Sequence, residues 1–185
     1  MHRLATLFVS FIAVTLPLAA QDSPRVEVFG GYQYLHAGNF DHAGDSINTN
    51  GWDLAAAFNF TRHLGVTADF SGSYKQDNGA QVHIYTYTFG PVASQNITAN
   101  FRIFVHALFG AAHLPTGCLI FSGSPDECGS GVATGFAMLI GGGVDAKVTK
   151  HFNFRLVQVD WARLPSEFGA TNGNVRVSTG AVLRF

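Results

Sequence analysis

The last twelve residues, "NVRVSTGAVLRF" (174–185), alternate strictly between two kinds of side chain. One parity carries Val175, Val177, Thr179, Ala181, Leu183 and Phe185, and the other carries Arg176, Ser178, Gly180, Val182 and Arg184. Because successive side chains of a strand point to opposite faces, this segment is predicted to be a β-strand with one apolar and one polar face. A water-soluble sheet shows the same pattern, so the segment alone leaves open which face meets water.

The composition of the whole chain is poor in charge. Of its 185 residues, 47% are apolar and only 12% are charged, about half the charged share of a typical soluble domain. No run after residue 20 reaches the roughly 18 apolar residues of a membrane-spanning helix. The net charge is −1 without a basic block, so no nucleic-acid partner is expected. The 17 Phe and 21 Gly suit tightly curved sheets better than helical bundles.

The first twenty residues have the order of a secretory signal peptide. Arg3 is followed by an apolar stretch over 4–14, a break at Pro17, and the small residues Ala19 and Ala20 before Gln21. This order predicts a signal peptide over 1–20 and a mature domain over 21–185. An uncleaved membrane anchor is the alternative.

Export gives a meaning to the two cysteines. Cys118 and Cys128 lie ten residues apart in "TGCLIFSGSPDECGSG" (116–131). In an oxidising compartment such a pair is predicted to close a loop as a disulfide. A metal site would need more ligands than this segment holds.

Seven further segments alternate like the C-terminal one. Their approximate bounds are 25–36, 50–60, 65–75, 81–92, 99–112, 134–148 and 152–163. Together with the C-terminal segment they give eight predicted strands. In "FNFRLVQVDWAR" (152–163) the apolar parity changes between Leu156 and Val157, which predicts a one-residue bulge there.

Short and longer connections alternate along the chain. The short ones are 61–64, 93–98 and 149–150. The others, mostly longer and rich in Gly, Asn, Asp, Ser and Pro, are 37–49, 76–80, 113–133 and 164–173. Short turns at one end and long loops at the other are typical of an up-and-down meander. We therefore expect an all-β fold: an eight-stranded antiparallel up-and-down barrel.

The polar parity of the strands carries charges of both signs. Its charged and titratable residues are Glu27, Asp53, Asp69, Arg102, His106, Asp145, Lys147, Asp160, Arg176 and Arg184. The parity change leaves the side of Arg155 open. The interior of an eight-stranded barrel is only just wide enough for side chains, and the other parity is rich in large aromatics. We therefore predict a transmembrane barrel with the polar parity inside and the apolar parity against lipid.

The predicted interior has consequences for function. Unpaired charges away from bulk water are costly, so these residues are expected to pair in a structural network. A filled and cross-linked lumen argues against a diffusion pore.

Aromatic residues on the apolar parity fall at two levels. Near the short turns lie Phe60, Phe89, Phe101, Phe154 and Phe185, and near the long loops lie Tyr34, Trp52, Tyr74, Tyr85, Phe136 and Trp161. Two aromatic girdles around a band of aliphatic residues match the two interfaces of a bilayer. The rival interpretation is a soluble lipocalin-like barrel, which would turn its apolar parity inward to hold a ligand and would not predict the girdles.

These features together resemble the small eight-stranded outer-membrane barrels, the OmpA-like and OmpX-like family. The resemblance covers about residues 25–185 and is carried by the alternating final strand that ends in Phe185. It implies that Phe185 is a signal for the outer-membrane assembly machinery. It also implies residence among the lipids of the outer membrane of a Gram-negative-type bacterium, with the short turns in the periplasm and four loops outside.

The expected role is structural or surface-interactive, either in envelope integrity or in adhesion. We expect a monomer whose disulfide-braced loop 113–133 meets an extracellular partner. Some barrels of this size modify lipid A as deacylases or acyltransferases, which makes such an enzyme the alternative. Its candidate residues would be His83, His113, Ser122 and Glu127, but no motif places them together, so no enzyme is expected.

Two other patterns in the sequence bear on cofactors and metals. "LIGGGVDAKV" (139–148) approaches a dinucleotide fingerprint, but a turn and a strand follow it where the fingerprint needs a helix. No pair among the eight His has the spacing of a zinc site. We therefore expect no cofactor and no metal.

Overall fold

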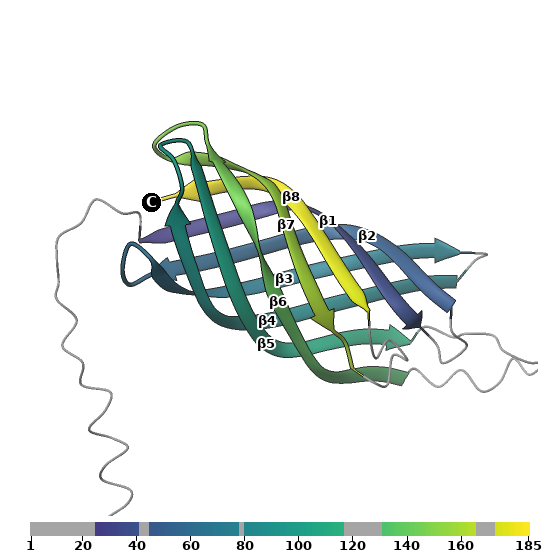
Figure 1. Ribbon diagram of the computed structural model, residues 1–185. Helices are drawn as coiled ribbons and strands as arrows, with labels where there is room; N and C mark the ends of the chain where they lie inside the picture. Colours follow the sequence, from purple (N-terminus) through teal and green to yellow (C-terminus); the bar gives the residue numbers. More distant parts are fainter. Residues whose placement is uncertain (1–24, 41–44, 78–79, 117–130, 166–172) are drawn as a thin grey trace, which may run out of the picture.

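The computed structural model describes residues 25–40, 45–77, 80–116, 131–165 and 173–185. They form eight strands: β1 (Val26–Phe40), β2 (Asp45–Asn59), β3 (Leu64–Asp77), β4 (Ala80–Asn96), β5 (Phe101–Thr116), β6 (Gly131–Lys147), β7 (Phe152–Arg163) and β8 (Asn174–Arg184). Each strand pairs antiparallel with the next, and β8 pairs with β1 to close the barrel (Figure 1). The predicted eight-stranded antiparallel up-and-down barrel is confirmed.

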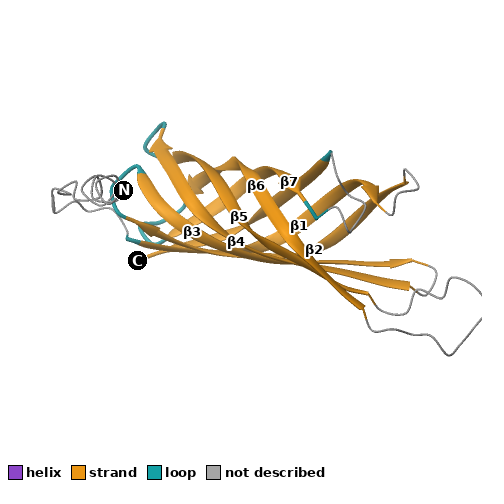
Figure 2. Ribbon diagram, turned by 90° about the horizontal axis from the view of Figure 1, so that it is seen from below, coloured by secondary structure: helices purple, strands orange, loops and turns teal. Residues whose placement is uncertain are grey.

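Figure 2 shows only strands and loops in the part of the chain that is described. Within those residues, no helix is long and apolar enough to cross a membrane. The predicted signal peptide (1–20) and both cysteines, Cys118 and Cys128, lie outside the described residues. Their assignments stay predictions.

Several strands extend further toward the long loops than the alternation predicted. β1 continues to Phe40 and β2 begins at Asp45, although residues 37–49 read as a loop from their composition. The ladder continues there through the pair Ala37 and Ile47 and, after a shift in register, through the pair Phe40 and Asp45. Backbone pairing in a hairpin therefore overrides the low strand propensity of Asn, Gly and Asp.

The predicted bulge in β7 is confirmed. Val144 of β6 pairs with Val157, and the next residue Asp145 pairs with Arg155, so Leu156 is the extra residue. Leu156 and Val157 are both exposed on the outer face. The bulge brings Arg155 onto the inner face, which the parity had left open.

The two faces of the barrel are occupied as predicted. On the outer face, Leu54 and Val105 are 45% and 60% exposed. On the inner face, Asp69 and Arg176 are only 1% and 2% exposed. Charged residues inside and large apolar residues outside reverse the arrangement of a water-soluble protein and are typical of a transmembrane barrel.

The interior has two zones, and only one of them is polar. An apolar cluster fills the half near the long loops and consists of Leu35, Ala37, Ile47, Ile84, Leu108, Ala112, Ala137, Leu139, Ala162 and Leu164. These residues share the inward parity of the charged residues but lie closer to the long loops. The predicted polar lumen is therefore found in the half near the short turns, and the half near the long loops is apolar.

Gly141 gives the interior the room that a side chain would remove. A Cβ at this position would lie 2.2 Å from both Asp160 Oδ1 and the Val159 carbonyl oxygen. Gly141→Ala is expected to lower the free energy of unfolding by about 1–3 kcal/mol through overpacking. Gly30→Ala is the matched control, because its Cβ would face outward with Leu54 Cδ1 at 3.9 Å as its nearest neighbour. Urea titration of the two variants in detergent micelles compares them, and equal stabilities would contradict the crowding argument.

Candidate functional site

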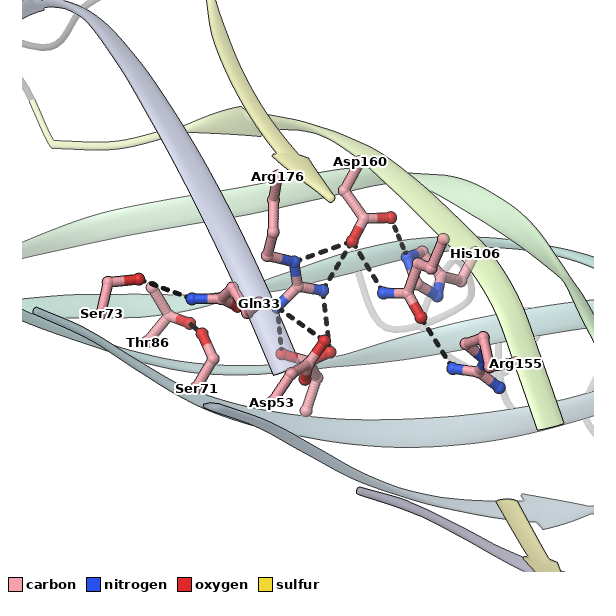
Figure 3. Close-up of polar contacts among 11 residues, drawn as sticks. Gln33, Asp53, Ser71, Ser73, Thr86, His106, Arg155, Asp160 and Arg176 are labelled. Carbon is pink, nitrogen blue, oxygen red and sulfur yellow. Dashed lines mark hydrogen bonds and ion pairs between the residues drawn. The ribbon is translucent and has the colours of Figure 1, made fainter. Parts of the chain in front are cut away.

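Arg176 of β8 lies at the centre of the charged half of the interior (Figure 3). Its Nη1 and Nη2 donate to the two carboxylate oxygens of Asp69 at 2.8 and 2.9 Å. Its Nε donates to Asp160 Oδ2 at 2.8 Å, and its Nη1 lies 3.8 Å from Asp53 Oδ2. The planar guanidinium has five N–H donors, which is why one Arg can serve several carboxylates at once.

Asp160 of β7 connects Arg176 to the rest of the interior. Its Oδ1 accepts from His106 Nε2 at 2.8 Å, and its Oδ2 accepts from Gln158 Nε2 at 2.7 Å. The Gln158 Oε1 in turn accepts from Arg155 Nη1 at 2.7 Å. Five strands (β2, β3, β5, β7 and β8) are thereby linked through two guanidinium groups.

Arg155 is held by both charge and aromatic contacts. Its Nε donates to Asp145 Oδ1 at 2.8 Å. Its guanidinium carbon lies 4.3 Å from the ring centre of Phe29 and 4.1 Å from that of Phe104. A desolvated cation between two aromatic rings is a strong cation–π arrangement.

A third group closes the interior near the short turns. Glu27 accepts hydrogen bonds from Arg102, from Asn59 at 3.2 Å and from Arg184 Nε at 3.2 Å. Arg102 also donates to Ser94. Each buried charge of this group therefore has a partner of opposite sign.

Neutral side chains continue the polar half toward the apolar cluster. Gln33 Nε2 donates to Ser73 Oγ at 2.6 Å. The hydroxyl groups of Ser71 and Thr86 are hydrogen-bonded at 2.6 Å (Figure 3). These bonds tie β1, β3 and β4 together at the level where the charges end.

The structure brings nearly all of the residues predicted for the interior into these groups. They are Glu27, Asp53, Asp69, Arg102, His106, Asp145, Asp160, Arg176 and Arg184. Lys147 is the exception, and its assignment to the interior is wrong. It shares the parity of Asp145 but is the last residue of β6, where its side chain is exposed.

Sequence reasoning missed the aromatic part of this site. Phe29 and Phe104 lie on the inward parity and are buried. The inward parity of these strands was identified from the neighbouring residues Glu27, Arg102 and His106. The alternation does not indicate that a guanidinium group stacks on these phenylalanine rings. The sequence left open whether Arg155 faces the interior or the lipid, because its face depends on the position of the bulge.

The stacked position of Arg155 gives a prediction. Arg155→Lys keeps the charge but loses the planar contact with both rings, and it is expected to lower the free energy of unfolding by about 1–2 kcal/mol. Arg184→Lys is the control, because Arg184 pairs with Glu27 and a lysine ammonium can keep this ion pair, so a smaller loss is expected. Chemical denaturation followed by tryptophan fluorescence measures both. A control variant as destabilised as Arg155→Lys would show that the stacking contributes nothing special.

Little space is left between the charged groups. A cavity of about 30 Å³ remains, and its lining includes Asn59, Thr67, Arg102 and Asp145. That volume holds about two water molecules.

Two of the four candidates for catalysis, His83 and His113, lie in the described part of the chain, on the neighbouring strands β4 and β5. His113 is hydrogen-bonded to Thr134 at 2.8 Å, and the His83 ring packs edge-on against Tyr74 and Tyr85. Ser122 and Glu127 lie outside the described residues. Within the described ranges, no group of three or more His, Cys, Asp or Glu is arranged to hold a metal ion.

Comparisons with known proteins bear on the fold. No model of a known protein family matches the sequence, and no curated protein matches it. Among solved structures, Ail, the attachment invasion locus protein of Yersinia pestis, is similar with a TM-score of 0.61 at 17% identity, over 88% of this chain and 99% of Ail.

Two other solved structures are similar as well. Neisserial surface protein A has a TM-score of 0.68 at 10% identity, over 89% of this chain and 100% of its own. The N-terminal β-barrel domain of Pseudomonas aeruginosa OprF has a TM-score of 0.54 at 12% identity, over 88% and 99%. The protein therefore has the fold of the small eight-stranded outer-membrane β-barrels, as the eight alternating segments together predicted.

Proposed function

We propose that the protein is an exported, monomeric outer-membrane barrel with a structural role and a closed interior that forms no diffusion pore. The observation that carries this proposal is that buried side chains occupy the interior both near the short turns and near the long loops. Ion pairs occupy the half near the short turns, and the apolar cluster occupies the half near the long loops. Ions that tried to pass would have to break buried salt bridges and then cross an apolar layer.

The outer face supports insertion among outer-membrane lipids. Large apolar side chains are exposed on every strand, and they would be covered only by a bilayer. Closure of the barrel leaves no strand edge unpaired in hydrocarbon. We place the short turns in the periplasm and the four longer loops outside the cell.

The long loops would add a surface role to the structural one. Loop 113–133, braced by a disulfide between Cys118 and Cys128, is the segment we propose for contact with an extracellular partner. The similar structure of Ail belongs to a protein named for attachment and invasion, which supports adhesion beside envelope integrity as the role.

Export and assembly would use the two ends of the chain. Residues 1–20 would direct secretion, and Phe185 would be read by the assembly machinery. The backbone N–H of Phe185 donates to the Val26 carbonyl at 2.9 Å in the closed barrel. The edge of β8 is therefore free for recognition only before β1 and β8 pair.

Two experiments test this proposal. Membrane fractionation with heat-dependent gel migration is expected to place a folded barrel in the outer membrane; recovery from the soluble fraction would contradict it. In planar bilayers the inserted protein is expected to give no steady ohmic conductance. A general diffusion porin at the same protein-to-lipid ratio is the positive control. Stable conductance steps from the pure protein would overturn the closed interior.

A further inference from the structure

The three described turns that join β2 to β3, β4 to β5 and β6 to β7 have the same structure. They read "FTRHL" (60–64), "ITANF" (97–101) and "VTKHF" (148–152). In each turn, the threonine hydroxyl accepts hydrogen bonds from two backbone N–H groups. Thr61 accepts from residues 63 and 64 at 3.2 and 3.0 Å. Thr98 accepts from residues 100 and 101, and Thr149 from residues 151 and 152, in both cases at 3.3 and 3.1 Å. These side-chain bonds fix the turn backbone.

Two of the three turns have a cation followed by a histidine at the tip. Arg62 and His63 occupy the first, and Lys150 and His151 occupy the third; all four are exposed. In both turns the imidazole Nδ1 donates to a carbonyl of a neighbouring strand end, His63 to Ser94 at 3.2 Å and His151 to Arg184 at 3.1 Å. The cation is therefore presented on a tip that is anchored in the same way twice.

The middle turn lacks this chemistry. It has Ala99 and Asn100 at the two tip positions, with the same threonine bonds and the same apolar flanks. It is a neutral copy of the two basic turns within the same chain.

Each turn also has apolar residues exposed beside its tip. The exposed flanking residues are Phe60, Leu64, Ile97, Phe101 and Val148. Apolar flanks below a cationic tip match the boundary between acyl chains and headgroups, where long basic side chains reach the phosphate level. The tips are therefore placed at headgroup level once the barrel is inserted.

The exposed side-chain charges at this end of the barrel have one sign. Among the described residues there, every exposed charged side chain is a cation: Arg25, Arg62, Lys147 and Lys150. The nearby carboxylates Glu27 and Asp145 are buried in ion pairs. The turns and the C-terminus lie together at this end (Figure 1), so the surface facing the adjacent leaflet is basic.

We propose that turns 60–64 and 148–152 bind the phosphate headgroups of anionic phospholipids in the leaflet on the short-turn side. The inference rests on the proposed membrane insertion and adds a lipid preference to it. Arg62 and Lys150 supply the charge for the phosphate, and the apolar flanks hold the acyl chains beside it. A basic residue at an anionic membrane surface contributes about 1 kcal/mol, or roughly fivefold in lipid preference for each turn.

The test uses the full protein in vesicles of equal phosphatidylglycerol and phosphatidylcholine. After mild extraction, the lipids retained on the protein are counted by native mass spectrometry. The wild type is expected to retain phosphatidylglycerol over phosphatidylcholine by roughly fivefold or more. The double variant Arg62→Gln/Lys150→Gln is expected to lose most of this preference, although Arg25 and Lys147 remain. A concentration of 1 M salt is expected to reduce the wild-type preference as well.

The neutral turn provides the matched control. Ala99→Lys in the wild-type chain is expected to raise the preference for phosphatidylglycerol, whereas Ala99→Gln is expected to leave it unchanged. The Ala99→Lys variant leaves both basic turns intact, so it decides the matter even if the double variant fails to insert. A preference that the double substitution leaves at the wild-type value, or that Ala99→Lys does not change, would overturn the inference.

Failure of this inference is distinguishable from failure of the proposed function. Heat-dependent gel migration of the same vesicles reports insertion separately. Insertion without a lipid preference overturns the headgroup sites and leaves the proposed function intact. The same conclusion holds if the inserted protein shows no lipid preference but binds an acidic peptide such as polyglutamate at its basic end. Absence of insertion overturns the proposed function together with the headgroup sites.

Discussion

Replacing Arg176 by Met is expected to lower the free energy of unfolding by about 3–5 kcal/mol. The substitution keeps much of the side-chain volume but removes the one guanidinium that lies among Asp53, Asp69 and Asp160. Three carboxylates would then face one another in a buried space. We expect the variant to assemble poorly and to lose its heat-dependent gel migration at lower temperature than the wild type.

Two companion variants make this prediction specific. Lys147→Met removes a cation of the same sign from an exposed position at the end of β6, and its effect is expected to stay within about 0.5 kcal/mol. Arg176→Lys keeps the charge but cannot bond both oxygens of Asp69 and also reach Asp160, so its stability should lie between those of Met and Arg. Urea titrations in micelles give all three values. Equal effects at 147 and 176 would contradict a central role for Arg176.

A charge on the outer face is expected to have the second largest effect. Val105 is 60% exposed in the band between the aromatic girdles. Val105→Arg would place a cation among acyl chains and is expected to cost about 2–4 kcal/mol near the bilayer midplane. The measurement is the unfolding free energy in lipid vesicles.

Depth provides the control for this variant. Val148 is also exposed but lies in the β6–β7 turn at the barrel end. Val148→Arg is expected to cost only about 0–1 kcal/mol, because charges near the interface reach water and headgroups. Equal costs at the two positions, or a neutral effect of Val105→Arg, would show that the outer band does not meet lipid.

The strand order and the sidedness could be predicted because a strand has a period of two. With charges on one parity and aromatics on the other, a shift by one residue would exchange the two faces, so the pattern fixes them. The bulge was predictable for the same reason, since Leu156 and Val157 cannot both face outward in a regular strand. The bulge in turn decides the side of Arg155.

The apolar half of the interior could not be predicted with equal ease. Leu35 and Leu108 lie on the inward parity. In this part of the strands the inward and the outward positions are both apolar, so the alternation of polar and apolar residues does not distinguish the two faces. The prediction for Lys147 was wrong because this residue is the last of β6. At the end of a strand, a side chain on the inward parity can still be exposed to solvent.

The choice of partners within the network also lay beyond the sequence. Arg176 bonds Asp69, which is 107 residues away, and Asp160 on the neighbouring strand. Alternation indicates that both point inward, but the contact depends on the stagger of strands around the closed barrel. The sequence thus indicates which residues face the interior, but not which of them form hydrogen bonds or ion pairs with one another.

Tryptophan quenching in vesicles tests the sidedness of the barrel most directly. The two tryptophans of the chain, Trp52 and Trp161, are 43% and 41% exposed on the outer face. In vesicles of brominated phospholipids their fluorescence is expected to be strongly quenched, while aqueous iodide should quench it weakly. Efficient quenching by iodide with no effect of the brominated lipids would contradict a lipid-facing apolar surface.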